Sequence, residues 1–198
     1  MGLSLTKQTI AYGKAVWQDV SDNASGGFLL NKLDIADDVE IVAGTPLGFD
    51  ESTRIATILK TASLYADATN TATTYQVKNG HLFKVGNYIG HVVGGKAYAI
   101  TDINTSNSNY DVLTVGTTLG VAMVAGETIF QSSATGATAC AYYVTPKALS
   151  YETISMSTGQ AIDAVLEGIV YSRRIPSLDS ALKAQIRSYS DIIFSDSY

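Results

Sequence analysis

The chain contains 198 residues, which is enough for one domain or for one domain that carries a small insertion. Charged residues make up 16% of it and the net charge is −5, so it has no general attraction to nucleic-acid phosphates and we expect no direct nucleic-acid binding. No run approaches the roughly 18 apolar residues of a membrane-spanning helix, and no secretion signal is recognisable, so we expect no membrane partner and assembly in the cytoplasm.

Residues 1–38 hold scattered apolar side chains interrupted by a polar, glycine-containing stretch at 21–27. The pattern predicts an extended N-terminal arm with little structure of its own. Trp17 is informative in such an arm, because a large apolar side chain needs a surface that covers it. That surface belongs either to the chain's own domain or to a neighbouring subunit.

Strands are predicted from residue 39 onward. Residues 39–42 and 54–60 are rich in aliphatic side chains, with turns expected at 43–47 and 49–53, the second of which would pair its flanking segments antiparallel. Residues 63–74 are ambiguous between helix and extended chain, and we assign them to a linker.

Residues 75–131 form a dense series of short predicted strands joined by glycine- and asparagine-rich turns. The pair Gly94-Gly95 suits a two-residue hairpin turn between residues 88–93 and 96–101. A second polar turn at 102–109 leads to a further strand, and a last strand is expected at 127–131. We predict a small antiparallel β-barrel inserted into another domain.

Residues 132–198 return to longer elements. Residues 161–171 are compatible with a helix or a strand, and their alternating pattern favours a strand. Ser177 is the expected N-cap of a short helix at 178–186, and residues 191–195 complete the chain as a strand. The predicted fold is mainly β: a discontinuous base domain (39–74 and 132–198) with one short C-terminal helix, carrying the barrel at 75–131.

The sequence offers no convincing catalytic or metal-binding set. Cys140 would need His81 or His91 as a base, yet it lies in a plain strand pattern that favours a buried thiol. The densest acidic cluster favours a solvated bend over a calcium or glycosidase site; it consists of Asp34, Asp37, Asp38 and Glu40. We expect no enzyme activity, no cofactor and no bound metal.

Several segments resemble auxiliary capsid proteins, the head decoration or head-fibre proteins of tailed bacteriophages, including crAss-like and related phages of Bacteroidetes-type hosts. The resemblance is carried by residues 42–47, 83–86, 95–100, 110–116, 173–176 and 192–198. It covers most of residues 39–198 and has no counterpart for the arm. It contains no active-site motif, so it implies a structural role.

The resemblance implies a virion protein on the capsid exterior that binds and stabilises the head shell. Its expected partner is the major capsid protein, and capsid symmetry favours a homotrimer. The expected contact residues are four apolar side chains of the arm and an arginine pair: Trp17, Phe28, Leu29, Leu30, Arg173 and Arg174. An alternative is a carbohydrate-binding or adhesin module whose surface glycan would stack on Tyr88, Tyr98 or Tyr110.

Overall fold

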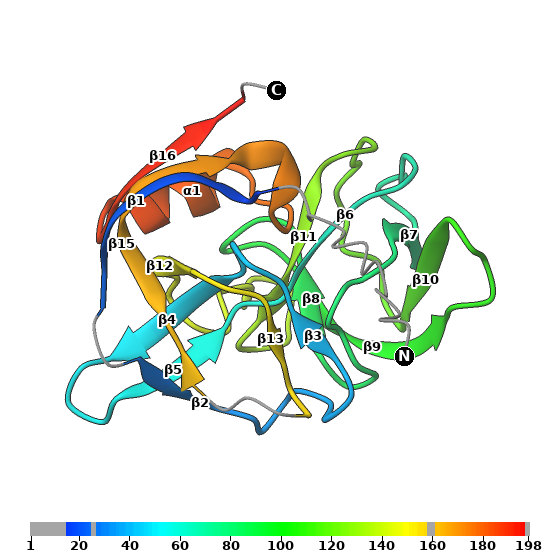
Figure 1. The fold of residues 1–198 in the computed structure, drawn as a ribbon. Helices are drawn as coiled ribbons and strands as arrows, with labels where there is room; N and C mark the ends of the chain where they lie inside the picture. Colours follow the sequence, from blue (N-terminus) through cyan, green and yellow to red (C-terminus); the bar gives the residue numbers. More distant parts are fainter. Residues whose placement is uncertain (1–14, 25–26, 158–160, 197–198) are drawn as a thin grey trace, which may run out of the picture.

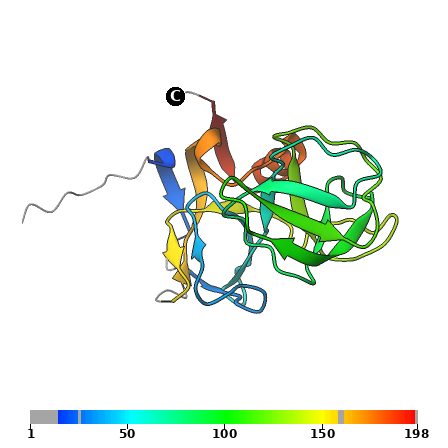
Figure 2. The same cartoon turned by 90° about the vertical axis from the view of Figure 1, so that its right-hand side faces the viewer.

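The computed structural model describes residues 15–24, 27–157 and 161–196. The fold is mainly β, as predicted, and the described residues include one α-helix near the C-terminus. Two sheets form two lobes that lie side by side, the base lobe and the barrel lobe, with the barrel coloured mainly green in Figures 1 and 2.

The base lobe is built on an eight-stranded sheet. Its strands are β1 (Trp17–Asn23), β2 (Phe28–Leu30), β4 (Pro46–Asp50), β5 (Ile55–Ile58), β12 (Ala148–Ser150), β14 (Ala161–Ile162), β15 (Ala164–Tyr171) and β16 (Asp191–Ser195). They follow the order β1-β15-β12-β4-β5-β2-β14, with β16 parallel to β15. A two-stranded sheet joins β3 (Glu40–Ile41) to β13 (Ile154–Ser155).

The barrel lobe is a six-stranded sheet with the order β6-β11-β8-β9-β10-β7. Its strands are β6 (Thr61–Ser63), β7 (Thr74–Lys78), β8 (Tyr88–Gly90), β9 (Ala97–Asn104), β10 (Tyr110–Val115) and β11 (Thr128–Ser132). A bridge between Leu64 and Val77 joins the two ends of this sheet, so it closes around its own core. The sheet takes in β6 as well as the strands expected within 75–131.

The prediction of an arm is wrong for the described residues 15–24 and 27–38. Here β1 pairs antiparallel with β15, and β2 lies between β5 and β14. Phe28 and Leu30 are buried in the base core, while the Trp17 indole donates a hydrogen bond to the Tyr151 carbonyl oxygen at 2.9 Å. The physical reason is that β1 pairs with a strand nearly 150 residues away, which no local pattern reveals. Residues 1–14, 25 and 26 of the predicted arm lie outside the described residues.

The predicted pairing of the strands on either side of Gly94 is confirmed, but the predicted length of the turn between them is wrong. Strands β8 and β9 are antiparallel neighbours, but the loop between them spans residues 91–96 instead of two residues. Gly94 has a φ of +79°, which favours glycine, and its amide donates to the Cys140 carbonyl oxygen at 2.7 Å. A contact with the irregular segment between β11 and β12 therefore holds the wider loop in place.

The strand interpretation of residues 161–171 is confirmed by β14 and β15, and the final strand by β16. The helix is α1 (Ser180–Arg187), preceded by a 3-10 turn, η1 (Ser172–Arg174). Its N-cap is Asp179, whose carboxylate accepts from the Leu182 amide at 2.7 Å, and the prediction of Ser177 is wrong. The Ser177 hydroxyl instead lies 2.7 Å from that of Thr128.

In the predicted turn at 43–47, β4 already begins at Pro46, so the turn is shorter than expected. The antiparallel pairing expected across residues 49–53 is confirmed by β4 and β5. Arg54 closes that turn with a φ of +56°, and its guanidinium lies 4.2 Å from the centre of the Phe28 ring.

Candidate functional site

The six predicted contact residues have very different surroundings. Trp17 packs within the base lobe, and Phe28 and Leu30 are buried there, so these three side chains stabilise the chain's own fold. Leu29, between two buried neighbours on β2, points outward and is 55% exposed. Arg173 and Arg174 follow β15 and line a cleft between the lobes.

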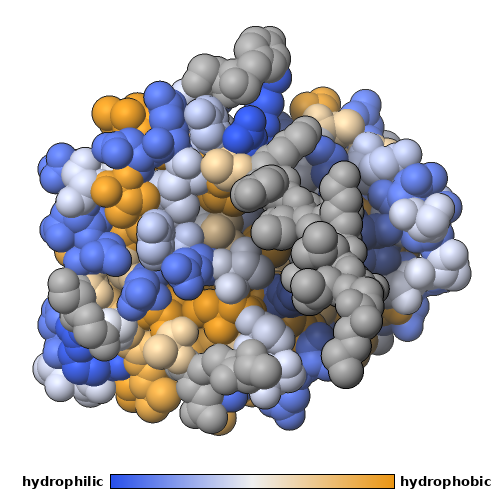
Figure 3. Space-filling view, in the orientation of Figure 1, coloured by the Kyte–Doolittle hydropathy of each residue, from blue (hydrophilic) through white to orange (hydrophobic). Residues whose placement is uncertain are grey.

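Leu29 belongs to a small apolar surface that we call the β2–β5 patch, composed of Leu29 and Ile55. Leu29 and Ile55 are register partners in the parallel β2–β5 pair, and Ile55 is 40% exposed. Leu33, shortly after β2, is 91% exposed. Figure 3 shows hydrophobic residues gathered on the lower part of the molecule, the region of β2 and β5 in Figure 1. Two neighbouring exposed aliphatic side chains, followed along the chain by the exposed Leu33, favour a contact surface.

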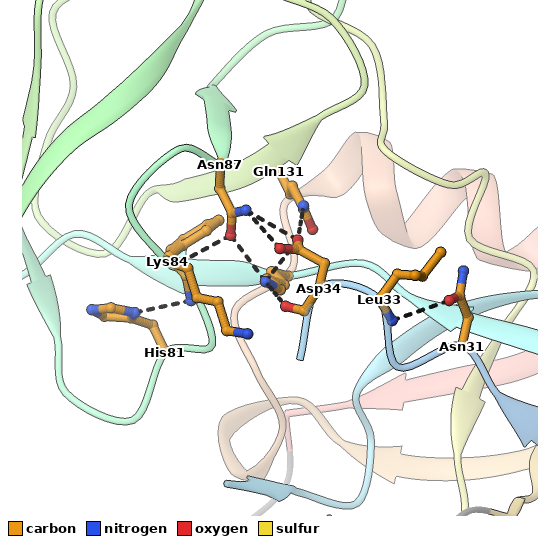
Figure 4. A network of polar contacts seen from close by, with 9 residues as sticks. Asn31, Leu33, Asp34, His81, Lys84, Asn87 and Gln131 are labelled. Carbon is orange, nitrogen blue, oxygen red and sulfur yellow. Dashed lines mark hydrogen bonds and ion pairs between the residues drawn. The ribbon is translucent and has the colours of Figure 1, made fainter. Parts of the chain in front are cut away.

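A buried polar network, the Lys60 network, joins the two lobes (Figure 4). It consists of Asp34, Lys60, Asn87 and Gln131. The Lys60 side chain is 1% exposed, and its ammonium donates to the Asp34 carbonyl oxygen at 2.5 Å, to Asp34 Oδ2 at 2.8 Å and to Asn87 Oδ1 at 2.9 Å. All three donor positions of the ammonium are therefore satisfied.

The barrel lobe supplies further donors to the Asp34 carboxylate. Asn87 Nδ2 donates to both carboxylate oxygens at 3.0 Å, and Gln131 Nε2 donates to Oδ2 at 2.6 Å. Figure 4 shows these side chains converging on Asp34. Because Asp34 precedes β3 in the base lobe while Asn87 and Gln131 belong to the barrel, the network fixes one lobe against the other.

The electrostatics of the pair follow from burial and from these contacts. Burial acts to raise the pKa of Asp34, but the hydrogen bonds from Lys60, Asn87 and Gln131 and the charge of Lys60 outweigh it and hold that pKa below its usual value. Burial also lowers the pKa of Lys60, and the Asp34 carboxylate partly offsets this effect. The carboxylate is therefore ionised at neutral pH and serves as the acceptor at the centre of the network.

Apolar contacts reinforce the same junction. Leu182 of α1 is fully buried in a cluster with Phe130 and Ala97 of the barrel and with Cys140. Ile186, one turn further along α1, packs against Leu149 in the base lobe. The short helix thus contacts both lobes, and the Lys60 network and α1 together make the two lobes one body.

The cleft lined by Arg173 and Arg174 has a volume of about 790 Å³. The turn after β15 forms one wall, and the end of β7 with the residues that follow it forms another, including Lys78 and His81. None of the described residues that line it is an aspartate or a glutamate. We call it the basic cleft.

The residues considered for catalysis are not brought together. Cys140 is buried, which raises the pKa of its thiol despite a hydrogen bond from Ser132 that acts in the opposite direction. His91 Nε2 lies 3.8 Å from Glu127, and His81 Nε2 lies 3.3 Å from Asp111. Among the described residues, no three histidine, cysteine or carboxylate side chains are grouped so that they could hold a metal ion.

The acidic bend is solvated as predicted at Asp37, Asp38 and Glu40, while Asp34 is taken up by the Lys60 network. Of the tyrosines of the carbohydrate alternative, Tyr88 and Tyr98 lie on the paired strands β8 and β9. Tyr98 packs against the barrel core, whereas Tyr110 pairs with Tyr65, their ring centres 5.0 Å apart. Sequence reasoning missed Lys60, although a lysine directly after the mainly apolar segment 55–59 was a visible signal.

No protein-family model, no curated protein and no solved structure matches this chain. In the part of the chain that the structure describes, no helix has the length and apolar character needed to cross a membrane. The geometry of the chain and the resemblance of its segments are thus the basis for a functional proposal.

Proposed function

We propose that the protein is an auxiliary capsid protein of a tailed bacteriophage, which binds the outside of the head shell through the β2–β5 patch and stabilises it. The resemblance of its segments to such proteins supports the class. The observation that carries the proposal is the exposure of Leu29, at 55%, between Phe28 and Leu30, which are 1% and 3% exposed. A firmly held strand thus presents one aliphatic side chain outward, beside Ile55.

The physical basis of such a role is selective binding. A protein that binds only the mature shell stabilises that state by mass action. Each contact can be weak, because a trimer that engages three capsid subunits at once gains effective concentration without any new contact. A body made rigid by the Lys60 network suits this role, since little conformational freedom is lost when it binds.

The direct test uses shells assembled without this protein and a matched pair of variants. Leu29→Asp places a charge in the β2–β5 patch, whereas Ile193→Asp places one on β16, at a side chain that is 58% exposed. We expect Leu29→Asp to lower the amount of protein that co-sediments with shells at least tenfold and Ile193→Asp to leave it unchanged. Equal binding of both variants and the wild type would contradict the role of the patch.

A second candidate, carbohydrate binding, is favoured by one observation. Tyr65 is 43% exposed and its ring is tilted by 32° against that of Tyr110, which gives an aromatic pair at the barrel surface. Aromatic rings at a surface offer apolar faces on which sugars can stack. Binding on a glycan array that disappears in Tyr65→Ala would support this function, and an array without any bound glycan would count against it.

A further inference from the structure

The basic cleft differs in charge from the rest of the molecule. The chain carries a net charge of −5, yet Lys78, Arg173 and Arg174 line this cleft without any carboxylate among its described lining residues. The cations come from both lobes: Lys78 ends β7, and the arginines lie in η1. The Arg174 guanidinium stacks 4.2 Å from the centre of the Tyr171 ring and donates to the Ala15 carbonyl oxygen, so it is held in position.

Three residues that line the cleft also hold buried polar atoms that lack hydrogen-bond partners. The Thr61 hydroxyl, the Ser172 hydroxyl and His81 Nε2 are all buried, lie in residues that line the cleft, and have no hydrogen-bond partner in the structure. Buried polar groups normally find partners because an unpaired one costs free energy. Three of them in one cleft point to a ligand that supplies acceptors.

The hydrogen bonding of the His81 ring also fits a ligand that supplies acceptors. Its Nδ1 accepts a hydrogen bond from the Phe83 amide at 3.2 Å, so the proton of the neutral ring is on Nε2. Asp111 Oδ2 lies 3.3 Å from Nε2 without the alignment of a hydrogen bond. The imidazole N–H, like the two hydroxyl groups, is thus a donor without an aligned acceptor.

We propose that the basic cleft binds an acidic peptide segment of a partner protein, with carboxylate oxygens as the acceptors. A volume of about 790 Å³ is far larger than one small oxyanion requires and suits several residues of extended chain. The net negative charge of the whole molecule disfavours a long polyanion such as nucleic acid, whose backbone would extend beyond the cleft. This inference does not depend on the proposed capsid function, because the peptide is tested on the isolated protein.

The test uses fluorescence anisotropy with a labelled octapeptide of alternating glutamate and serine, and the matched glutamine peptide as its control. At low salt we expect the glutamate peptide alone to bind, and binding to weaken as salt screens the charges. In Lys78→Gln the affinity should fall about two- to fivefold, which is what one exposed ion pair contributes. The matched variant Lys183→Gln, on α1 outside the cleft, should bind like the wild type.

A second variant separates binding from stability. Thr61→Val replaces the unpaired hydroxyl by a methyl group of similar shape, so the melting temperature of the free protein should stay the same or rise. The affinity for the glutamate peptide should nevertheless fall about two- to tenfold, because one donor to the carboxylates is lost. A fall in melting temperature together with unchanged affinity would overturn the role of this hydroxyl.

Two competitors distinguish other ligands. If inorganic phosphate displaces the peptide at equal concentration, the cleft is a site for a small oxyanion and the proposal is wrong. If a single-stranded oligonucleotide binds more tightly than the peptide, nucleic acid is the better ligand and the proposal is wrong again. Equal binding of the glutamate and glutamine peptides would also overturn it.

Discussion

Lys60→Met is the most informative perturbation of the fold, because it removes one charge from the junction of the lobes while keeping a side chain of similar length. The side chain of Lys60 is 1% exposed and that of Asp34 is 28% exposed. The substitution leaves the Asp34 carboxylate without its counter-charge and leaves Asn87 Oδ1 without the ammonium donor. The other donors to Asp34, Asn87 and Gln131, remain.

Removal of one partner from a buried ion pair typically costs about 3–5 kcal/mol. Because Asp34 is partly accessible to water and retains two amide donors, we expect the lower end, about 3 kcal/mol, in the free energy of unfolding. The assay is urea unfolding at pH 7, with Lys183→Met as the control, for which a change within about 0.5 kcal/mol is expected. The double variant Lys60→Met/Asp34→Asn should regain part of the loss, since no unpaired charge is left buried.

A loss below about 1 kcal/mol in Lys60→Met would refute the reasoning, because it would mean that the network contributes no more than an exposed ion pair. A double variant as unstable as the single one would refute the part that assigns the cost to the unpaired carboxylate.

Three further outcomes are expected. Gly90→Ala should lower the melting temperature, because the new Cβ would lie 2.2 Å from Cys140 Sγ. Adding Cys140→Ala to this variant should recover part of the lost stability. If nothing is recovered, the clash is not the cause. Asp179→Ala should cost about 1 kcal/mol by loss of the N-cap, and an unchanged urea midpoint would contradict that role. Burial lowers the pKa of His81, although the nearby Asp111 acts in the opposite direction. Below about pH 6.5 the unfolded chain therefore takes up a proton that the folded chain does not. The free energy of unfolding should fall between pH 7 and 5, and it should fall less in His81→Gln.

Local patterns predicted the elements whose signal lies within a few residues. The alternation of residues 161–171 identified β15. The spacing of Leu178, Leu182 and Ile186, which would share one helical face, identified α1. The N-terminal strands escaped prediction because their partners are distant: Trp17 pairs with Val170, and Leu29 with Ala161. Such pairings depend on the tertiary fold, and a short strand alone resembles an irregular segment.

The candidate sites likewise combine residues that can be recognised in the sequence with neighbours that only the fold supplies. Arg173 and Arg174 are recognisable in the sequence as an adjacent pair. Their cleft also requires Lys78 and Thr61 from the other lobe, and only the folded chain brings these residues together. Leu29 is exposed while Phe28 and Leu30 are buried, because the register of β2 determines which of its side chains face water. Sequence reasoning thus identified some of the residues, and the surfaces that they form depend on the fold.

The measurement that tests the central proposal most directly is co-sedimentation of the purified protein with phage head shells assembled without it, preceded by light scattering to determine its mass in solution. The proposal predicts a trimer that binds the wild-type shells to saturation and loses binding in Leu29→Asp. A monomer that stays in the supernatant at every concentration of shells would contradict it.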